Sequence, residues 1–488
     1  MPTLSSAAQK VYATALQEAP LGIYEAAQDR YRPIPASIDP VVIDDQLWES
    51  VAADCDAIMK ALQKLARFLR QPPQRARARL LFEHLDGLEA EAAAGEHDAG
   101  DDLATVRFDM FFAQDDLKLL EINTTIPAMQ AYGEMVRQAF AAAWVHESKS
   151  TPHLSFLDRH STAQALLDRL MRLAPNKPQH IAVVARAGDA QKAELLYLQK
   201  FWHERAGVRV SCVQPEQIRW QDGKLTLDGE SVDLIYRHIF ASRIDPKSDF
   251  AAACRQGAPI FNPITAHLEV KALLAELSTR AAGHPSEPRP SSWTEAECAA
   301  IRRRLPWTRL LRAGPSVLPD GSVIEDFLPY LQQKPLQDLV FKTSSGYGGH
   351  GVIIGAEWQT ADTQARLKEI LKLKDAGPVS LQSFLLAASE GPELWVVQER
   401  IRGQKRTHSF LQAGVPQEGR DHYFDVSLFG PDFQRAGGVS RFAADPIVNL
   451  GKGGGMAPLF LTSEAERLGL PQYRAKVVMT VKPTIKPR

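Results

Sequence analysis

Hydrophobic and polar residues alternate along residues 106–113 and again along residues 117–123. Alternation with a period of two is typical of strands that have one buried face. The polar residues 114–116 between the two runs supply turn chemistry, so the pattern predicts a two-stranded β-hairpin. A turn of three residues pairs Ala113 with Leu117 and thereby fixes which side chains share a face of the ribbon.

That register places two carboxylates side by side. Asp109 faces Glu121, and Arg107 faces Asn123 on the same side of the hairpin. Like charges directly opposite each other destabilise a sheet, so a chain that keeps them there usually provides a counter-charge, and an all-oxygen ligand set suits Mg²⁺. The alternative is a solvated strand face whose acidic side chains point into water. A loop of four residues would place Asp109 and Glu121 on opposite faces and exclude a shared metal site.

Longer stretches of the chain follow helical and open α/β patterns. Apolar residues recur at helical spacing before a break at Pro72 and Pro73, which predicts a helical N-terminal layer. From residue 180, strand, helix and strand patterns follow one another as in a βαβ unit, and the absence of a GxGxxG turn argues against a dinucleotide site. The predicted helices are 47–69, 131–145 and 192–207, and the predicted strands are 180–186, 208–214 and 232–239.

The segment 280–319 breaks this regular alternation. It is rich in Pro, Ser and Arg. Such a composition is typical of an exposed connection with little fixed structure of its own.

Composition narrows the class of partner. The 488 residues carry 57 Lys and Arg against 58 Asp and Glu, a balance that disfavours nucleic acid or an anionic membrane as a partner. The Arg-rich run 67–79 reads as a solvated helix face rather than a nucleic-acid site. With no apolar run of 18 residues, no secretory pattern at the start and four scattered cysteines, we expect a cytoplasmic protein that binds small molecules.

A glycine-rich segment follows a β-branched strand at residues 340–355. Lys342 lies in that strand, ahead of Gly346, Gly348, Gly349 and Gly351. Glycines permit a loop whose N–H groups close over phosphate oxygens, and the strand lysine can reach the same charge. The loop therefore predicts a phosphate clamp, although a plain tight turn would look the same and the Walker pattern is absent.

The hairpin also resembles a known family. Arg-x-Asp, followed about a dozen residues later by Glu-x-Asn, is similar to the magnesium-binding strand pair of the circularly permuted ATP-grasp ligases, which include glutathionylspermidine synthetases and eukaryotic-type glutathione synthetases. In that family the Asp, Glu and Asn coordinate Mg²⁺ on the ATP phosphates, and the Arg stabilises the acyl-phosphate. The resemblance implies these roles for Asp109, Glu121, Asn123 and Arg107, respectively.

The resemblance extends to the nucleotide. The family has a first lysine on a helix after an Asn-Pro turn, and the corresponding residue here is Lys271. It also has a strand end whose backbone hydrogen-bonds adenine, which corresponds to residues 399–401 here. The alternative for 399–401 is an ordinary strand end. Arg441, among glycines, offers a fork for a carboxylate or acyl-phosphate, where the alternative is a surface arginine. The residues implied to bind ATP are Lys271, Lys342, Ser345, Gly346, Gly348, Gly349, Gln398, Glu399, Arg400, Ile401 and Asn449.

The implied fold is an α/β (α+β) ATP-grasp fold, circularly permuted, with an N-terminal helical layer. Its expected parts are a helical region with the metal hairpin at 1–175, an open α/β substrate domain at 176–262, the nucleotide region at 263–475 and a tail at 476–488. Arg237 would lie at a strand end in the substrate cleft, or else in a structural ion pair. In the glycine loop, residues 343–345 depart from the family, which places a metal-binding Glu there.

The implied activity is ATP- and Mg²⁺-dependent joining of a carboxylate to an amine through an acyl-phosphate. The substrates would be amino-acid, peptide or polyamine-like molecules, and family members form homodimers. Two alternatives stay open, namely an ATP-grasp kinase of a small-molecule hydroxyl and a non-catalytic nucleotide-binding protein. The sequence identifies neither the acid nor the amine.

Overall fold

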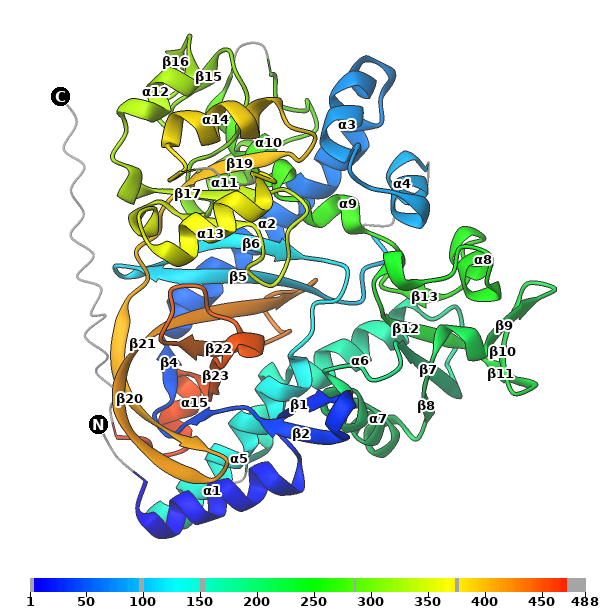
Figure 1. Cartoon of the computed structure of the whole chain (residues 1–488). Coiled ribbons are helices and arrows are strands. Elements are labelled where there is room, and N and C mark those ends of the chain that lie inside the picture. The colour runs from blue at the N-terminus through cyan, green and yellow to red at the C-terminus, as the bar shows by residue number, and fades with distance from the viewer. Residues whose placement is uncertain (1–3, 96–100, 150–153, 285–286, 374–376, 472–488) are drawn as a thin grey trace.

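The computed structural model describes residues 4–95, 101–149, 154–284, 287–373 and 377–471. Figure 1 shows a mixed α/β structure in which a large central sheet lies below a smaller, helix-covered sheet and beside an open α/β layer. The mixed α/β class predicted from the sequence is confirmed. The expected tail at 476–488 lies outside the described residues.

The central sheet has seven strands and joins segments from both ends of the chain, in the order β20-β3-β23-β22-β21-β5-β6. Side chains of helix α2 (Asp45–Leu69) share one apolar core with Phe108 and Met110 on one face of this sheet. Because side chains alternate along a strand, Arg107 and Asp109 point to the opposite face. The strands are β3 (Ala36–Ser37), β5 (Val106–Ala113), β6 (Asp116–Asn123), β20 (Lys405–Gln412), β21 (Val415–Gly430), β22 (Gly438–Ala443) and β23 (Gly455–Ala457).

The hairpin β5–β6 has the predicted pairing at the site but not the predicted turn. Arg107 pairs with Asn123 and Asp109 with Glu121, as expected. At the tip, however, Ala113 pairs with Asp116, so the turn has two residues instead of three, and a bulge between Asp109 and Met110 restores the register. The two deviations cancel because a bulge adds one residue to one strand.

The predicted helices around this sheet are present, and the break at the two prolines is confirmed. Helix α2 ends before Pro72, and a short helical turn precedes α3. Four strands that the helical interpretation did not include precede α2. The elements are α1 (Ser6–Glu18), β1 (Gly22–Glu25), β2 (Arg30–Pro33), β4 (Val41–Ile43), α2 (Asp45–Leu69), α3 (Arg75–Phe82), α4 (Gly87–Ala94), α5 (Gln130–Ser148), α6 (Thr162–Leu173), β24 (Leu459–Leu461) and α15 (Thr462–Arg467).

The smaller sheet is antiparallel, in the order β14-β19-β17-β18. Edge-on contacts of Phe384 with Phe341, Trp358 and Trp395 form the centre of its core. Figure 1 shows this sheet and its helices above the hairpin. Its elements are β14 (Thr308–Leu310), α12 (Phe327–Gln333), β17 (Leu339–Thr343), β18 (Val352–Ile354), α13 (Ala361–Ile370), α14 (Leu381–Glu390) and β19 (Trp395–Glu399).

The prediction of an unstructured connection at 280–319 is wrong. The segment contains α11 (Glu295–Arg304), β14 and β15 (Ser316–Val317), and α10 (Lys271–Ala282) runs into it. Thr294 and Glu297 form a reciprocal capping box that starts α11. Trp293 and Ile301 are buried in the same core as α2. The Pro- and Arg-rich composition suggested a connection without fixed structure. The capping-box pattern at residues 294–297 is the part of the sequence that indicates a helix.

The open α/β layer is a parallel four-stranded sheet, and its predicted βαβ unit is confirmed. The order β13-β12-β7-β8 places β8 on one side of β7 and β12 on the other. Gly207, with φ of 66°, ends the connecting helix in the left-handed conformation. Its elements are β7 (His180–Ala185), α7 (Lys192–Ala206), β8 (Arg209–Val213), β12 (Leu234–His238), α8 (Asp249–Arg255) and β13 (Ile260–Phe261), with a small antiparallel sheet of β9 (Ile218–Gln221), β10 (Lys224–Leu227) and β11 (Glu230–Val232).

Arg237 has a structural role that neither sequence interpretation anticipated. Its guanidinium is buried and donates to the carbonyl oxygens of Asn262 and Pro263, each at 2.8 Å. It also donates to the carbonyl of Ile239. Since its partners are carbonyls, Arg237 is neither a cleft residue nor half of an ion pair.

Asn262 joins the α/β layer to the hairpin, and its loss is expected to destabilise the fold. The side chain is buried. Its Oδ1 accepts from the N–H groups of Ala104 and Thr105 at 2.7 and 3.0 Å, and its Nδ2 donates to the carbonyls of Thr105 and Thr124. Each orphaned buried group costs about 1–3 kcal/mol. We therefore expect Asn262→Ala to lower the free energy of unfolding in urea by about 3–5 kcal/mol. Asn262→Asp keeps the acceptor but sets a carboxylate oxygen against the carbonyls of Thr105 and Thr124, so it should not restore this stability. An unchanged urea midpoint for the alanine variant would contradict the role.

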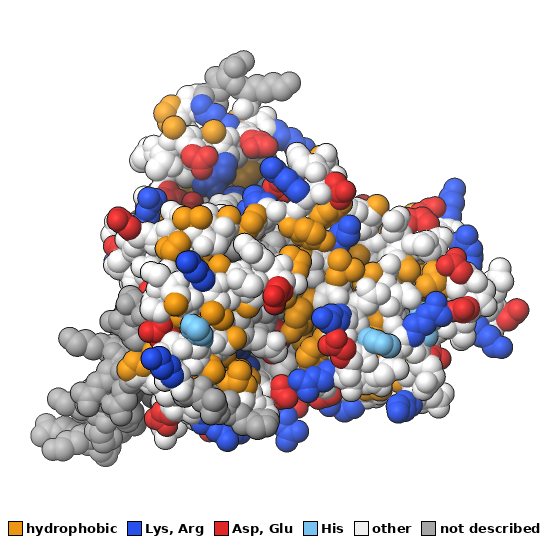
Figure 2. Space-filling model, turned by 90° about the horizontal axis from the view of Figure 1, so that it is seen from below, with side chains coloured by type: hydrophobic (Ala, Val, Ile, Leu, Met, Phe, Trp, Pro, Cys, Tyr) orange, Lys and Arg blue, Asp and Glu red, His pale blue; other side chains and the backbone are white. Residues whose placement is uncertain are grey.

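Charges of both signs are mixed on the surface (Figure 2). On the face in Figure 2, Lys and Arg side chains are interspersed with Asp and Glu side chains rather than gathered by sign. In the described ranges, no helix has both the length and the apolar character needed to cross a membrane.

Candidate active site

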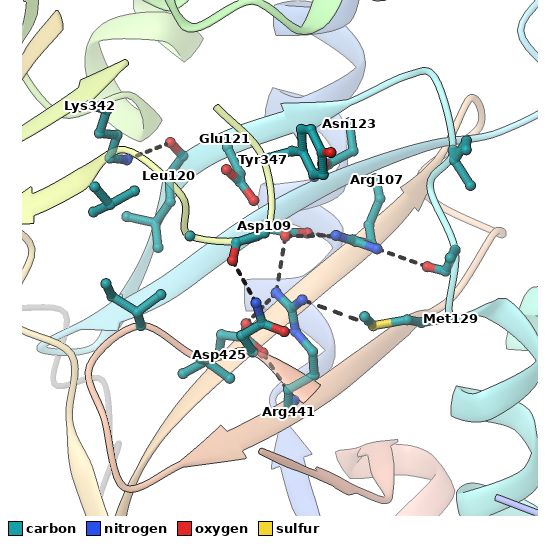
Figure 3. A pocket seen from close by; sticks show the side chains of 18 of the residues that line it. Arg107, Asp109, Leu120, Glu121, Asn123, Met129, Lys342, Tyr347, Asp425 and Arg441 are labelled. Carbon is teal, nitrogen blue, oxygen red and sulfur yellow. Dashed lines mark hydrogen bonds and ion pairs between the residues drawn. The ribbon is translucent and has the colours of Figure 1, made fainter. Parts of the chain in front are cut away.

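A cavity of about 440 Å³ lies where the central sheet, the smaller sheet and the open α/β layer meet. Figure 3 shows the hairpin side chains and Lys342 around it. Most residues singled out in the sequence line it: Arg107, Asp109, Glu121, Asn123, Lys342, Gly348, Gly349, Gln398, Glu399, Arg400, Ile401, Arg441 and Asn449. Lys271, Ser345 and Gly346 are not among the lining residues.

Asp109 is buried between two arginines. Both Nε and Nη2 of Arg107 donate to its two oxygens, at 2.6 and 3.0 Å, and Nη2 of Arg441 donates to Oδ2 at 3.0 Å. Burial raises the pKa of Asp109, but the two guanidinium charges outweigh it and hold that pKa well below the usual range. The carboxylate is therefore ionised and committed to arginine. Its role as a metal ligand stays a prediction.

Asp425 completes this cluster, and the sequence interpretation did not include it. It lies opposite Arg441 in the pairing of β21 and β22, and it accepts from both Nε and the backbone N–H of Arg441, at 2.9 and 3.0 Å. Asp425 is 2% exposed. Its signal in the sequence was a lone carboxylate in the otherwise apolar strand 422–430, because an acidic side chain is seldom buried without a partner.

Glu121 and Asn123 supply the side-chain oxygens of the hairpin strand opposite Asp109 and Arg107. The Glu121 carboxylate is 32% exposed, and Nζ of Lys271 lies 3.8 Å from its Oε2. Nδ2 of Asn123 is buried and has no hydrogen-bond partner among the described residues. A carboxylate and an amide that line one cavity supply oxygen atoms of the kind that Mg²⁺ prefers.

Of the two predicted lysines, Lys342 lines the cavity, whereas Lys271 contacts the glycine loop. Lys342 on β17 donates to the carbonyl of Leu120 at 3.1 Å and to Oε1 of Gln398 at 2.7 Å. Leu120 is the extra residue at the hairpin bulge, so the unforeseen bulge provides the carbonyl that Lys342 binds. Lys271, the first residue of α10, donates to the carbonyl of Gly346.

Lys342 should make binding to the predicted nucleotide site depend on pH. Burial lowers the pKa of this ammonium to about 8. The charged form, which attracts phosphate, therefore dominates below about pH 8 and disappears as the pH rises. We expect calorimetry to show ATP affinity falling above that pH by up to about tenfold per unit. Lys342→Arg should remove this fall in affinity because the guanidinium stays charged over the same pH range. An identical fall in both proteins would assign the titration to another group.

The glycine loop closes over the cavity, but its serines turn away. Gly348 and Gly349 line the cavity with φ of 60° and 77°, a conformation that glycine adopts readily. Oγ of Ser345 donates to Glu393 at 2.9 Å on the exposed side. Oγ of Ser344 accepts the backbone N–H of Ala272. Neither hydroxyl is thus directed at a second metal, the role that the Glu plays in the resembling family.

Asn449 ties a second loop to the glycine loop. Its Nδ2 donates to the carbonyl of Gly348 at 2.6 Å, and its Oδ1 accepts from the N–H of Gly451 at 2.7 Å. Beside it, Ile447 and Val448 also line the cavity. The contact holds the two loops together over the opening.

The predicted adenine strand end retains one unused N–H group. The N–H groups of Glu399 and Arg400 donate to the carbonyls of Trp307 and Asp338, both at 2.8 Å. Among the described residues, the N–H of Ile401 has no such partner, and Ile401 lines the cavity. The cavity also has apolar lining residues, namely Phe111, Leu120, Val340, Val352 and Ile354. A flat ring with one polar edge suits such a lining.

The open α/β layer closes the other end of the cavity with residues that no sequence motif identified. Arg186 follows β7, and its Nε lies 3.3 Å from Oδ2 of Asp189. His238, the last residue of β12, holds Oε1 of Gln191 at 2.7 Å. These residues lie at the carboxyl ends of β7 and β12, which are neighbours in the sheet. The chain leaves β7 toward β8 on one side and β12 toward β13 on the other, and open α/β sheets bind ligands at such a point.

No protein-family model matches this sequence, and no curated protein sequence is significantly similar to it. Among solved structures, the chain is similar to a glutathione synthetase-like effector from Globodera pallida in its apo form. The TM-score is 0.56 at 11% identity over 94% of this chain and 98% of that chain. A candidate γ-glutamylcysteine synthetase from Methylobacillus flagellatus gives a TM-score of 0.40 at 12% identity over 82% and 86% of the two chains. The first likeness shows a shared fold along nearly the whole chain.

Proposed function

We propose that this protein is an ATP-dependent ligase that joins a carboxylate to an amine through an acyl-phosphate and releases ADP and phosphate. The observation that carries the proposal is the convergence of Arg107, Arg441 and Lys342 with Glu121 and Asn123 on one cavity between two sheets. Phosphoryl transfer needs positioned positive charge more than covalent chemistry, and this cavity has that character.

The same arrangement supports a circularly permuted ATP-grasp fold as the finer description. The glycine loop with Lys342 lies above the hairpin that carries Glu121, so a triphosphate between the two sheets would be held from both sides (Figure 3). The shared fold with a glutathione synthetase-like protein supports this proposal.

The residues of the cavity have separable roles in the proposed reaction. The N–H of Ile401 would bind the adenine edge, the apolar lining of the cavity would contact the ring, and Glu399 would accept from the ribose. Lys271 and Lys342 would offset the negative charge of the phosphates. Bound Mg²⁺, for which Glu121 and Asn123 fit as ligands, would supply further charge neutralisation on the phosphate oxygens.

Arg107 and Arg441 would act where new charge develops. A carboxylate placed against their remaining N–H groups would be held for in-line attack on the γ-phosphorus, which forms the acyl-phosphate. The amine then attacks the acyl carbon, the C–O bond to phosphate breaks, and the amine proton leaves to an acceptor in the cavity. The arginines stabilise the oxyanion of the tetrahedral intermediate, and the proposed route uses no enzyme nucleophile.

We propose that both substrates are small molecules, of the amino-acid, peptide or polyamine-like class, bound toward the open α/β layer. The alternative of a kinase would use the same nucleotide residues. It differs in its product, because a phosphoester is stable whereas an acyl-phosphate is trapped by hydroxylamine.

The test begins with calorimetric titration of ATP into the purified protein, with and without Mg²⁺, alongside Glu121→Ala. We expect metal-dependent binding that the variant loses. Candidate acids and amines are then screened by ADP release, with hydroxylamine replacing the amine. Hydroxamate formation supports the ligase, and ADP release with a stable phosphoester supports the kinase. No ATP binding by the unsubstituted protein would refute both.

A further inference from the structure

The four charged side chains at the floor of the cavity form one buried network. Arg107 binds Asp109, Asp109 binds Arg441, and Arg441 binds Asp425. All four are between 2% and 7% exposed. Two carboxylates balance two guanidiniums, so the network is close to neutral and its members hold one another in place.

We infer that Asp109 and Asp425 are positioning residues, which orient Arg107 and Arg441 toward the cavity, and that the metal is held on the hairpin by Glu121 and Asn123 without Asp109. This inference rests on the proposed function. It changes the role that the sequence resemblance gives to Asp109, and it assigns a role to Asp425.

The bonds of Asp109 leave little room for a metal. A carboxylate offers about four lone-pair sites. Three of them accept a guanidinium N–H: Oδ1 accepts from Nε of Arg107, and Oδ2 accepts from Nη2 of Arg107 and Nη2 of Arg441. A cation bound to the remaining site would sit beside two positive groups that have no water between them and the carboxylate. Mutual repulsion disfavours that placement.

Both arginines are bound by the buried carboxylates and also line the cavity. Besides Asp109, Arg107 donates through Nη1 to the carbonyl of Ala128 at 2.9 Å. Nη1 of Arg441 lies 3.9 Å from Sδ of Met129. A guanidinium carries five N–H groups. Among the described residues, two N–H groups of Arg107 and one of Arg441 have no partner and are available to an anion in the cavity that both arginines line.

Asp425 fixes Arg441 through the geometry of the sheet. The two residues are opposite each other in β21 and β22, and Asp425 binds both the backbone N–H and the side chain of Arg441. A side chain held at both ends keeps one rotamer, so its fork is already aimed before an anion arrives.

Mn²⁺ binding in the presence of ATP, measured by electron paramagnetic resonance, distinguishes a residue that holds the metal from one that positions the arginines. The proteins compared are the unsubstituted chain, Asp109→Asn and Glu121→Gln, which each remove one hairpin carboxylate charge at paired positions. We expect Glu121→Gln to weaken Mn²⁺ binding by about tenfold or more, as loss of a metal-site group does. Asp109→Asn should leave it within about twofold.

Because Asp109→Asn leaves buried guanidinium charge uncompensated, a second variant guards against misfolding. Arg107→Gln combined with Asp109→Asn keeps the network neutral, and it should also retain Mn²⁺ affinity. Loss of Mn²⁺ binding in either Asp109 variant to the extent seen in Glu121→Gln would overturn the inference. Absence of Mn²⁺ binding in the unsubstituted protein with ATP would instead refute the proposed function, and the inference with it.

The positioning role has its own kinetic readout. Asp109→Asn and Asp425→Asn should each lower kcat by about tenfold or more while the KM for ATP stays within about twofold, since misaimed arginines weaken the transition state and not nucleotide binding. A rise in the KM for ATP with unchanged kcat would contradict it.

Discussion

Replacing Arg441 with methionine is expected to lower the free energy of unfolding by about 3–5 kcal/mol, the usual cost of leaving a buried charge unpaired. Arg441 is the shared partner of Asp109 and Asp425, so its removal leaves two carboxylates facing each other in a buried site. Turnover, measured as ADP release with an accepted acid and amine, should fall by about 10³-fold or more, as when an arginine that stabilises phosphoryl transfer is lost. Urea unfolding measures the first effect independently of the second.

A double variant separates the two consequences of losing Arg441. Adding Asp425→Asn to Arg441→Met removes one of the uncompensated carboxylates, so part of the lost stability should return. Turnover should not return, because the guanidinium is still missing. Recovery of both would mean that Arg441 acts through the fold alone, and no change in stability for the single variant would contradict the buried pairing.

The hairpin shows how a sequence pattern can place a site while missing how the chain forms it. Alternation identified the two strands, and the pairs Arg107 with Asn123 and Asp109 with Glu121 are as predicted. The turn was predicted one residue too long, and the bulge that compensates left no mark in the alternation of residues. The contact that the bulge makes depends on the folded chain, in which Lys342 from a distant strand binds the Leu120 carbonyl.

Buried polar residues with distant partners were the hardest to foresee. Asp425 and Arg441 are 16 residues apart, and Asp109 reaches Arg441 across 332 residues. No local pattern encodes such contacts. The βαβ unit was readable because its signals are local, whereas α11 was missed because composition was weighed above the cap at Thr294.

The strand predicted before the glycine loop is present as β17, yet the neighbours of the loop decide which of its groups face the cavity. Ser345 turns outward because Glu393 accepts its hydroxyl, while Gly348 and Gly349 remain over the cavity. The sequence therefore predicts the loop and its lysines, and tertiary contacts decide the role of each side chain.

Lys271→Met is expected to produce the second large loss, in nucleotide affinity. The Lys271 ammonium is buried, donates to the Gly346 carbonyl and lies 3.8 Å from Glu121. It therefore both anchors the glycine loop and offsets negative charge in the site. Removing one partner of a buried charged bond costs about 2–5 kcal/mol, or roughly 30- to 5,000-fold in the calorimetric Kd for ATP with Mg²⁺. Lys200→Met removes a lysine that is 77% exposed on α7 and should bind ATP as the unsubstituted protein does. Equal affinities for all three proteins would mean that Lys271 only supports the loop, and the charge it contributes would have to come from Lys342.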